Sequence, residues 1–496
     1  MQVYYIEYLR YHIMNETIRR SDYRHRASKR RRQRFFHRLP LILIILLLFI
    51  LLTVFCWLLG RHFLGKDSPP TMSSPIPSST GEEPVRTESS TELEISTDPE
   101  PTMDPMVDEL LDDADRIAAG YDYDRAIALL QDSKFYGSNS AVDEAIAEYE
   151  QIKSTLKPYD ITQITHVFFH TLVMDESKAF DGDSDESGYN QVMTTKDEFL
   201  KILDAMYEKG YVLVRLHDMA ELADGEDGTK MTRKAILLPE GKKPFVMSQD
   251  DVCYYEYMDG DGFATRMIIG EDGKPTCEMK MEDGSIQVGA FDLVPILEEY
   301  IQEHPDFSYK GARAVIAFTG YQGILGYRTA PSYSDSPTYE QDKETAAAVA
   351  QCLRDNGWEL ASHSWGHRDL GTIPWDNFKA DCDKWNNEVK SLIGPTDIIL
   401  FPFGADVGDW HPYASDNERF RYLKNLGFSY FCNVDSSRFW VQVGDDFLRQ
   451  GRRNLDGYRM WMDIAAGSDT SKRKLDDLFR AEDIFSPNRP TPVVWE

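Results

Sequence analysis

KPFVMSQDD (residues 243–251) is the stretch that decides the fold prediction, because a short apolar run ends there in two adjacent carboxylates. The apolar residues predict a strand, and side chains that leave the carboxyl end of a strand in an α/β barrel point into the mouth of the barrel. Pairs of aspartates are common in a chain with 83 acidic residues and usually mark a turn. The place of Asp250 and Asp251 directly after this strand favours chemistry instead.

HSWGH (residues 363–367) is the second informative stretch, and it follows another strand-like run at 358–361. Its spacing can place the imidazoles of His363 and His367 on one side of a turn. Two histidines and one carboxylate form a facial ligand set for a divalent ion such as zinc, and Asp251 is the predicted carboxylate. Asp250, the acid left over, is predicted to take the proton of an attacking water. The alternative is that both histidines are ordinary surface residues.

These two stretches resemble the motifs of the polysaccharide deacetylase family, also called carbohydrate esterase family 4, and the resemblance covers roughly residues 160–496. It implies that Asp250 is the catalytic base and that Asp251, His363 and His367 bind the metal. Zinc is the first choice of metal, with cobalt, manganese and nickel as alternatives.

The family also has an Arg-Pro-Pro-Tyr-Gly-like segment that lines the pocket, and the matching segment here reads LFPFG at 400–404. The resemblance implies that the backbone N–H of Phe403 contacts the oxyanion. Trp365, inside the histidine motif, is taken as a further substrate contact.

Two features of the family are missing. Leu400 stands where the family has the arginine that orients the base, and no histidine follows His411, so the usual general acid is absent. His411 and His170 are the candidate proton donors, although each is also expected as a structural or pocket-lining histidine. Arg328 and Arg453 are candidates to replace the lost positive charge.

The apolar periodicity of residues 159–496 alternates between helix and strand, which predicts a mostly parallel sheet. The expected helices are 196–210, 292–303, 341–356, 377–393 and 417–426, and the expected strands include 211–214, 314–318, 398–401 and 430–434. The resemblance implies that the sheet closes into an incomplete or distorted β/α barrel. An insertion at 252–290 predicts three short strands, either as a wall of a substrate groove or as a surface hairpin.

The amino-terminal part predicts a membrane anchor. Residues 41–59 form an apolar run long enough to span the roughly 30 Å hydrocarbon core as a helix. The basic run KRRRQR at 29–34 predicts that the amino terminus stays in the cytoplasm. Because the apolar run is long and no small-x-small site follows it, we expect a retained signal anchor rather than a cleaved signal peptide. The predicted parts are a cytoplasmic tail at 1–38 and a transmembrane helix at 39–60, with the rest of the chain extracellular.

Two further parts separate this anchor from the predicted catalytic domain at 159–496. Residues 61–105 are rich in Pro, Ser and Thr, a composition that predicts a disordered linker. Residues 106–158 predict a small helical region with helices at 107–120, 124–131 and 141–156. This region either spaces the catalytic domain from the membrane or docks on it, and it is a candidate for contact with a partner protein.

Charge is divided unevenly along the chain. Residues 1–66 carry a net charge of +10 and the remainder −39, within a total of −29. So acidic an exterior excludes nucleic acid as a partner and fits neutral sugar chains. Six scattered cysteines without a CxxC pair imply no disulfide framework. The acidic loop at 181–186 lacks the glycine and glutamate of a calcium loop and is expected to be a solvated turn.

The function expected from these residues is a membrane-anchored, metal-dependent hydrolase that removes acetyl groups from an N-acetylated cell-envelope polysaccharide, such as a polymer containing N-acetylglucosamine. In it a metal-bound water attacks and Asp250 is the base. The alternatives are a catalytically impaired glycan-binding protein, an O-acetyl esterase, and a surface scaffold whose helical region recruits partners.

Overall fold

The computed structural model describes residues 105–226 and 228–495. Seven parallel strands close into a barrel in which the order around the barrel follows the order along the chain. The strands are β2 (Thr165–Phe169), β7 (Lys243–Gln249), β11 (Val315–Phe318), β12 (Glu359–Ser362), β13 (Ile398–Leu400), β14 (Tyr430–Val434) and β16 (Leu448–Asn454). Because β16 pairs with β2, the sheet is closed rather than incomplete. The predicted β/α barrel is confirmed in this form.

The barrel is distorted at β7. One edge of β7 pairs with β2 along five residues, whereas the other edge is shared by two strands. The start of β7 pairs with β3 (Tyr211–Leu213), and its end pairs with β11 through Ser248 and Gln249. The carboxyl end of β7 therefore lies inside the closed part of the barrel.

Helices follow the barrel strands as the periodicity predicts. The larger ones are α7 (Lys196–Glu208), α8 (Leu293–Glu303), α9 (Tyr339–Asp355), α10 (Trp375–Lys384), α12 (Glu418–Asn425) and α13 (Gly457–Ala465). Shorter ones are α5 (Glu176–Ala179), α6 (Glu186–Val192), α11 (Lys390–Ile393) and α14 (Ala481–Ile484). Helix α7 begins with a capping box in which Thr195 and Glu198 each satisfy the other's backbone N–H.

The prediction of one continuous helix over 377–393 is wrong. Helix α10 ends at Lys384, a π-helical turn follows at Trp385–Val389, and α11 then begins. The π turn places Trp385 so that its Nε1 donates a hydrogen bond to the carbonyl oxygen of Phe318, 2.8 Å away, at the end of β11. Such single-turn insertions are frequent near functional sites.

Alternate residues of each barrel strand belong to two apolar clusters, as expected for a closed barrel. In β11, Ile316 and Phe318 belong to the cluster under the helices, and Val315 and Ala317 belong to the other cluster, inside the barrel. The inner cluster continues through the amino-terminal end of the barrel to the helical region. The interior of the barrel is therefore packed.

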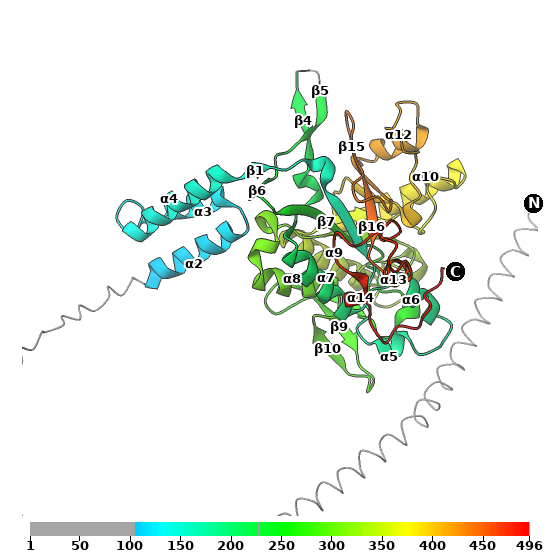
Figure 1. Ribbon diagram of the computed structural model, residues 1–496. Coiled ribbons are helices and arrows are strands. Elements are labelled where there is room, and N and C mark those ends of the chain that lie inside the picture. The colour runs from blue at the N-terminus through cyan, green and yellow to red at the C-terminus, as the bar shows by residue number, and fades with distance from the viewer. Residues whose placement is uncertain (1–104, 227, 496) are drawn as a thin grey trace, which may run out of the picture. The chain divides into compact units, whose positions relative to one another are not determined.

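The helical region consists of α2 (Pro105–Ala119), α3 (Tyr123–Gln131) and α4 (Ser140–Thr155), which lie side by side in Figure 1. The backbone N–H of Lys310 donates to the carbonyl oxygen of Gly120 at 2.7 Å, and the Tyr121 hydroxyl donates to the carbonyl oxygen of Asp306 at 2.9 Å. The ring of Tyr121 also stacks on Tyr309. Of the two arrangements that the sequence leaves open, these contacts correspond to docking on the barrel.

The insertion after β7 forms a three-stranded antiparallel sheet, which confirms its predicted strands. These are β8 (Arg266–Ile269), β9 (Pro275–Lys280) and β10 (Ile286–Gly289). Other strands lie outside the barrel. They are the pair β1 (Lys157–Pro158) and β6 (Leu237–Leu238), the hairpin β4 (Ala220–Gly225) and β5 (Gly228–Arg233), and β15 (Val441–Val443) on the edge of β16.

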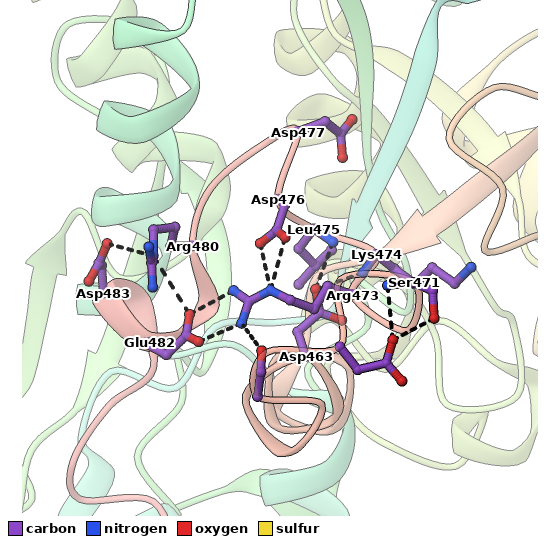
Figure 2. A network of polar contacts seen from close by, with 12 residues as sticks. Asp463, Ser471, Arg473, Lys474, Leu475, Asp476, Asp477, Arg480, Glu482 and Asp483 are labelled. Carbon is purple, nitrogen blue, oxygen red and sulfur yellow. Dashed lines mark hydrogen bonds and ion pairs between the residues drawn. The ribbon is translucent and has the colours of Figure 1, made fainter.

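The segment after α13 is held to the rest of the chain by charged side chains, as Figure 2 shows. Arg473 donates to Asp476 at 2.8 Å and to Glu482 at 2.5 Å. Asp463 accepts the backbone N–H groups of Lys474 and Leu475. These contacts fix the last turns of the chain against α13.

The predicted cytoplasmic tail, transmembrane helix and linker at 1–38, 39–60 and 61–105 lie outside the described residues, apart from Pro105 at the start of α2, and stay predictions. Within the described part, no helix is both long and apolar enough to cross a membrane. The five cysteines of this part are all free and buried, in agreement with the absence of a disulfide framework.

A buried charge cluster at the amino-terminal end of the barrel gives a test of the fold. His217 lies between Glu359, at the start of β12, and Asp397, whose Oδ1 is 3.0 Å from His217 Nε2. Burial by itself would lower the pKa of His217, but hydrogen bonds to Asp397 and Glu359 raise it to about 10. The folded state therefore holds this proton more tightly than the unfolded state, whose value is near 6.5.

We expect the variant His217→Gln to lower the free energy of unfolding by about 1 kcal/mol at pH 6, a modest value because the side chain is 39% exposed. The stabilisation is complete below about pH 6.5 and is lost as the pH rises through about 10. Urea unfolding of both proteins at pH 6, 8 and 10.5 measures this difference. An equal difference at all three pH values would contradict the assignment.

Candidate active site

The carboxyl ends of β7 and β12 bring the three predicted ligands together. Oδ2 of Asp251 lies 3.9 Å from Nε2 of His363 and 3.5 Å from Nε2 of His367. The three ligand atoms all lie within 4.8 Å of one another. Residues separated by more than a hundred positions in the sequence thus meet at one point.

Three residues of this group have a left-handed backbone that side chains other than glycine seldom adopt. The φ angles are +59° at Asp251, +56° at Ser364 and +49° at His367. Each such residue costs on the order of 1–3 kcal/mol, and such residues cluster at functional sites. Here the strained conformations turn the two motifs back toward each other.

The turn that carries the histidines is fixed from below by α10. The carboxylate of Asp381 accepts the backbone N–H groups of Trp365 at 2.8 Å and Gly366 at 2.9 Å. The indole of Trp365 donates to Glu388 at 2.6 Å and lies so close to Gly320 that a Cβ there would be 2.4 Å from it. The structure therefore places Trp365 in the packing around the turn, and its printed partners are not the ligand side chains.

Two further contacts orient the ligand atoms. Nδ1 of His363 lies 2.8 Å from the carbonyl oxygen of Leu400, and because a carbonyl only accepts, the ring proton is assigned to Nδ1. Nε2 of His363 then carries the lone pair. The hydroxyl of Tyr255 donates to Oδ1 of Asp251 at 2.7 Å and is also bonded to Thr319. Metal ligands in proteins are commonly held by such contacts, and the sequence analysis did not identify Tyr255.

The donor set fits a divalent metal ion. It offers two imidazole nitrogens and one carboxylate oxygen, the combination that suits zinc and related first-row ions. Asp251, His363 and His367 are the residues that would hold the ion.

Asp250 lies beside the ligand set and is almost fully buried. Its Oδ1 accepts a hydrogen bond from Nη1 of Arg452 at 2.7 Å, and its Oδ2 is 3.8 Å from Nε2 of His363. Burial alone would raise the pKa of Asp250, but the charges of Arg452 and His363 outweigh it and hold the pKa well below its ordinary value. The carboxylate is therefore ionised, and one of its oxygens faces the ligand set.

Arg452 on β16 supplies the charge that the sequence analysis sought at Arg328 or Arg453. Arg328 donates to the carbonyl oxygen of Tyr254 at 2.8 Å. Arg453 pairs instead with Asp477, one of the residues shown in Figure 2, at 2.8 Å. Side chains alternate along a strand, so neighbours in β16 point to opposite sides and only Arg452 of these three reaches Asp250.

The two candidate proton donors have different surroundings. His170 follows β2, its Nδ1 bonds the carbonyl oxygen of Val192 at 3.1 Å, and its charge helps to lower the pKa of both Asp250 and Asp251. His411 is exposed and bonds to Asp409. His170 is therefore within electrostatic reach of the site, and no printed contact links His411 to it.

Phe403 lies next to the ligand set at the carboxyl end of β13. Its ring meets the ring of His367 edge to face with 4.5 Å between centroids, and the side chain is 71% exposed. Its backbone is also left-handed, with φ +57°. The role of its N–H as an oxyanion contact stays a prediction.

Two other features lie apart from these residues. Asp183, Asp185 and Asp261 also bring ligand atoms within 4.8 Å of one another, in the acidic loop that was expected to be a solvated turn. A cavity of about 850 Å³ lies between α10, α12 and the turn before β16, and none of the predicted site residues lines it.

Comparison with known proteins gives a limited result. No family model and no curated protein matches the chain. A Streptococcus pyogenes deacetylase, PplD, solved in complex with acetate, aligns with 11% identity over 61% of this chain and 94% of its own, with a TM-score of 0.32. A de-N-acetylase from Aggregatibacter actinomycetemcomitans aligns with 14% identity over 59% of this chain and 95% of its own, with a TM-score of 0.33. Function is therefore argued from the residues of the site.

We expect the protein to bind one equivalent of zinc at this set, measured by metal analysis and by competition with a chelating dye. His363→Gln should remove most of this affinity, because it deletes a ligand. Tyr255→Phe should weaken it about 10- to 100-fold, since it removes the hydrogen bond that orients Asp251.

Asp183→Asn is the control for the second group of carboxylates and should leave zinc binding unchanged. Unaltered stoichiometry and affinity in His363→Gln would contradict the assignment of the ligands.

Proposed function

We propose that the protein is a metal-dependent hydrolase that removes acetyl groups from an N-acetylated polysaccharide of a cell envelope. The observation that supports it best is the pairing of a buried, ionised Asp250 with a ligand set of one carboxylate and two histidines. A carboxylate beside such a set has no structural need to be there, and its burial in an unpaired state would be costly. Arg452 offsets that cost.

Asp250 has the geometry of a general base. A divalent ion held by the set lowers the pKa of water and polarises a carbonyl oxygen. Oδ1 of Asp250 is held by Arg452, and Oδ2 faces His363, so one oxygen is available to accept the proton of the attacking water. Water adds to the acetyl carbon, the carbon–nitrogen bond breaks, and acetate and the free amine leave.

His170 is proposed as the donor of the proton that the leaving amine needs. Its bond to the carbonyl oxygen of Val192 fixes the ring, and its charge acts on both aspartates of the site. Transfer by a positioned histidine is the commonest form of general acid catalysis. His411 is not adopted for this role, because its partner is the exposed Asp409.

The polysaccharide substrate follows from the resemblance of the two motifs to polysaccharide deacetylases and from the acidic exterior, which suits a neutral or cationic chain better than a polyanion. The idea of a binding protein without activity depended partly on the missing arginine. Arg452 weakens that alternative. The anchor at 39–60 and the extracellular location belong to the proposal on the sequence alone.

The first test is acetate release from N-acetylglucosamine oligomers by the zinc-loaded protein. Asp250→Asn keeps the size of the side chain but removes the base, so we expect the rate to fall about 10²- to 10⁴-fold while zinc stays bound. No acetate from the unmutated protein with zinc bound would reject the deacetylase. Release from O-acetylated but not N-acetylated sugars would identify an esterase instead.

The proton donor can be tested by a pair of histidine variants. His170→Gln should lower kcat for the N-acetyl substrate about 10²-fold or more, because the amine leaves poorly without a proton. An activated aryl acetate, whose leaving group needs no proton, should be much less affected. His411→Gln is the matched control and should keep kcat within about twofold; the reverse pattern would transfer the role to His411.

A further inference from the structure

Four polar side chains lie buried in a line inside the barrel. His166 comes from β2, Ser248 from β7, and Gln450 and Arg452 from β16, and none of the four has more than 1% of its surface exposed. Barrel interiors are normally filled with branched apolar side chains. A polar interior at this position therefore asks for an explanation beyond packing.

The four residues form one hydrogen-bonded chain, which we call the interior relay. Nε2 of Gln450 donates to the carbonyl oxygen of Ile164 at 3.0 Å, and its Oε1 lies 3.1 Å from Nδ1 of His166. Nε2 of His166 lies 3.0 Å from the hydroxyl of Ser248. That hydroxyl accepts from Nη1 of Arg452 at 3.2 Å. Arg452 in turn reaches Asp250.

The direction of every bond in the relay follows from its two ends. At one end a backbone carbonyl can only accept, so Gln450 donates with its nitrogen and offers its oxygen to His166. The proton of His166 then lies on Nδ1, and its Nε2 accepts from Ser248. At the other end an arginine can only donate, so the Ser248 oxygen accepts from Arg452. Burial lowers the pKa of His166 well below its ordinary value, which is consistent with the neutral ring that this order requires.

The relay restrains a guanidinium that contacts Asp250 through one nitrogen only. The printed contact of Arg452 with Asp250 is a single hydrogen bond rather than a two-pronged pair, which by itself leaves the plane of the guanidinium free to tilt. Nη1 divides its two hydrogens between Asp250 and Ser248. The ring of Phe168 lies 4.4 Å below Cζ of Arg452 and supports its face. Together these contacts fix the group.

We infer that the interior relay is a positioning device, in which His166 and Ser248 hold Arg452 so that Asp250 keeps one oxygen turned toward the ligand set. This role rests on the proposed function. His166 and Ser248 are positioning residues, because neither touches the reacting groups. The competing explanation is that the relay only satisfies buried polar groups and stabilises the barrel.

Matched serine variants separate these explanations. In Ser248→Ala we expect kcat for acetate release to fall about tenfold, with KM and zinc affinity within about twofold of the unmutated protein. Ser308→Ala is the control, because its hydroxyl is equally buried and bonds the carbonyl oxygen of Ala312 at 2.8 Å in another part of the fold. Both variants should lose similar stability. A kcat for Ser248→Ala within twofold of that for Ser308→Ala would overturn the positioning role.

A second measurement reads the relay without turnover. Nitrogen NMR of labelled histidine in the full-length protein should show His166 as a neutral ring protonated on Nδ1, with its Nε2 signal shifted in Ser248→Ala and unchanged in Ser308→Ala. A proton on Nε2, or a cationic ring, would overturn the relay. If the unmutated protein releases no acetate, the proposed function and the positioning role both fall, whereas the NMR result still decides whether the relay exists.

Discussion

The pairing of β16 with β2 is the interaction on which the site depends. Arg452 is opposite His166 in this pairing, and closure of the barrel carries its side chain to the carboxylate of Asp250, 202 positions earlier in the chain. Without closure, the end of β7 would present a buried carboxylate with no cation. The cost of such a charge is several kcal/mol, so the fold and the electrostatics of the site require each other.

Strain and hydrogen bonds are concentrated around the same point. Asp251, Ser364, His367 and Phe403 all have a left-handed backbone, and all lie at the carboxyl ends of barrel strands. Contacts from surrounding elements hold them there: Asp381 from α10, Tyr255 from the insertion, and the carbonyl oxygen of Leu400 from β13. The rigid barrel stores the strain, and the loops carry the chemistry.

The sequence predicted the ligand residues well because each motif is local. A strand followed by Asp250 and Asp251, and two histidines four positions apart, can be recognised without knowing the fold. Arg452 could not be found in this way. LRQGRRN, the sequence of β16, has little of the apolar character that predicts a strand, because its inward face carries polar groups. Once the strand is known, alternation together with Gln450 identifies Arg452, rather than Arg453, as the inward residue.

The place of Leu400 shows what a change of strand means for recognising proteins by pattern. Its side chain belongs to the apolar interior, while its backbone oxygen serves His363. A motif that demands an arginine at this position describes an address in the sequence, whereas the site requires only a positive charge at a point in space. The same charge can be delivered from β16, and a search keyed to the address would pass over a chain that meets the requirement.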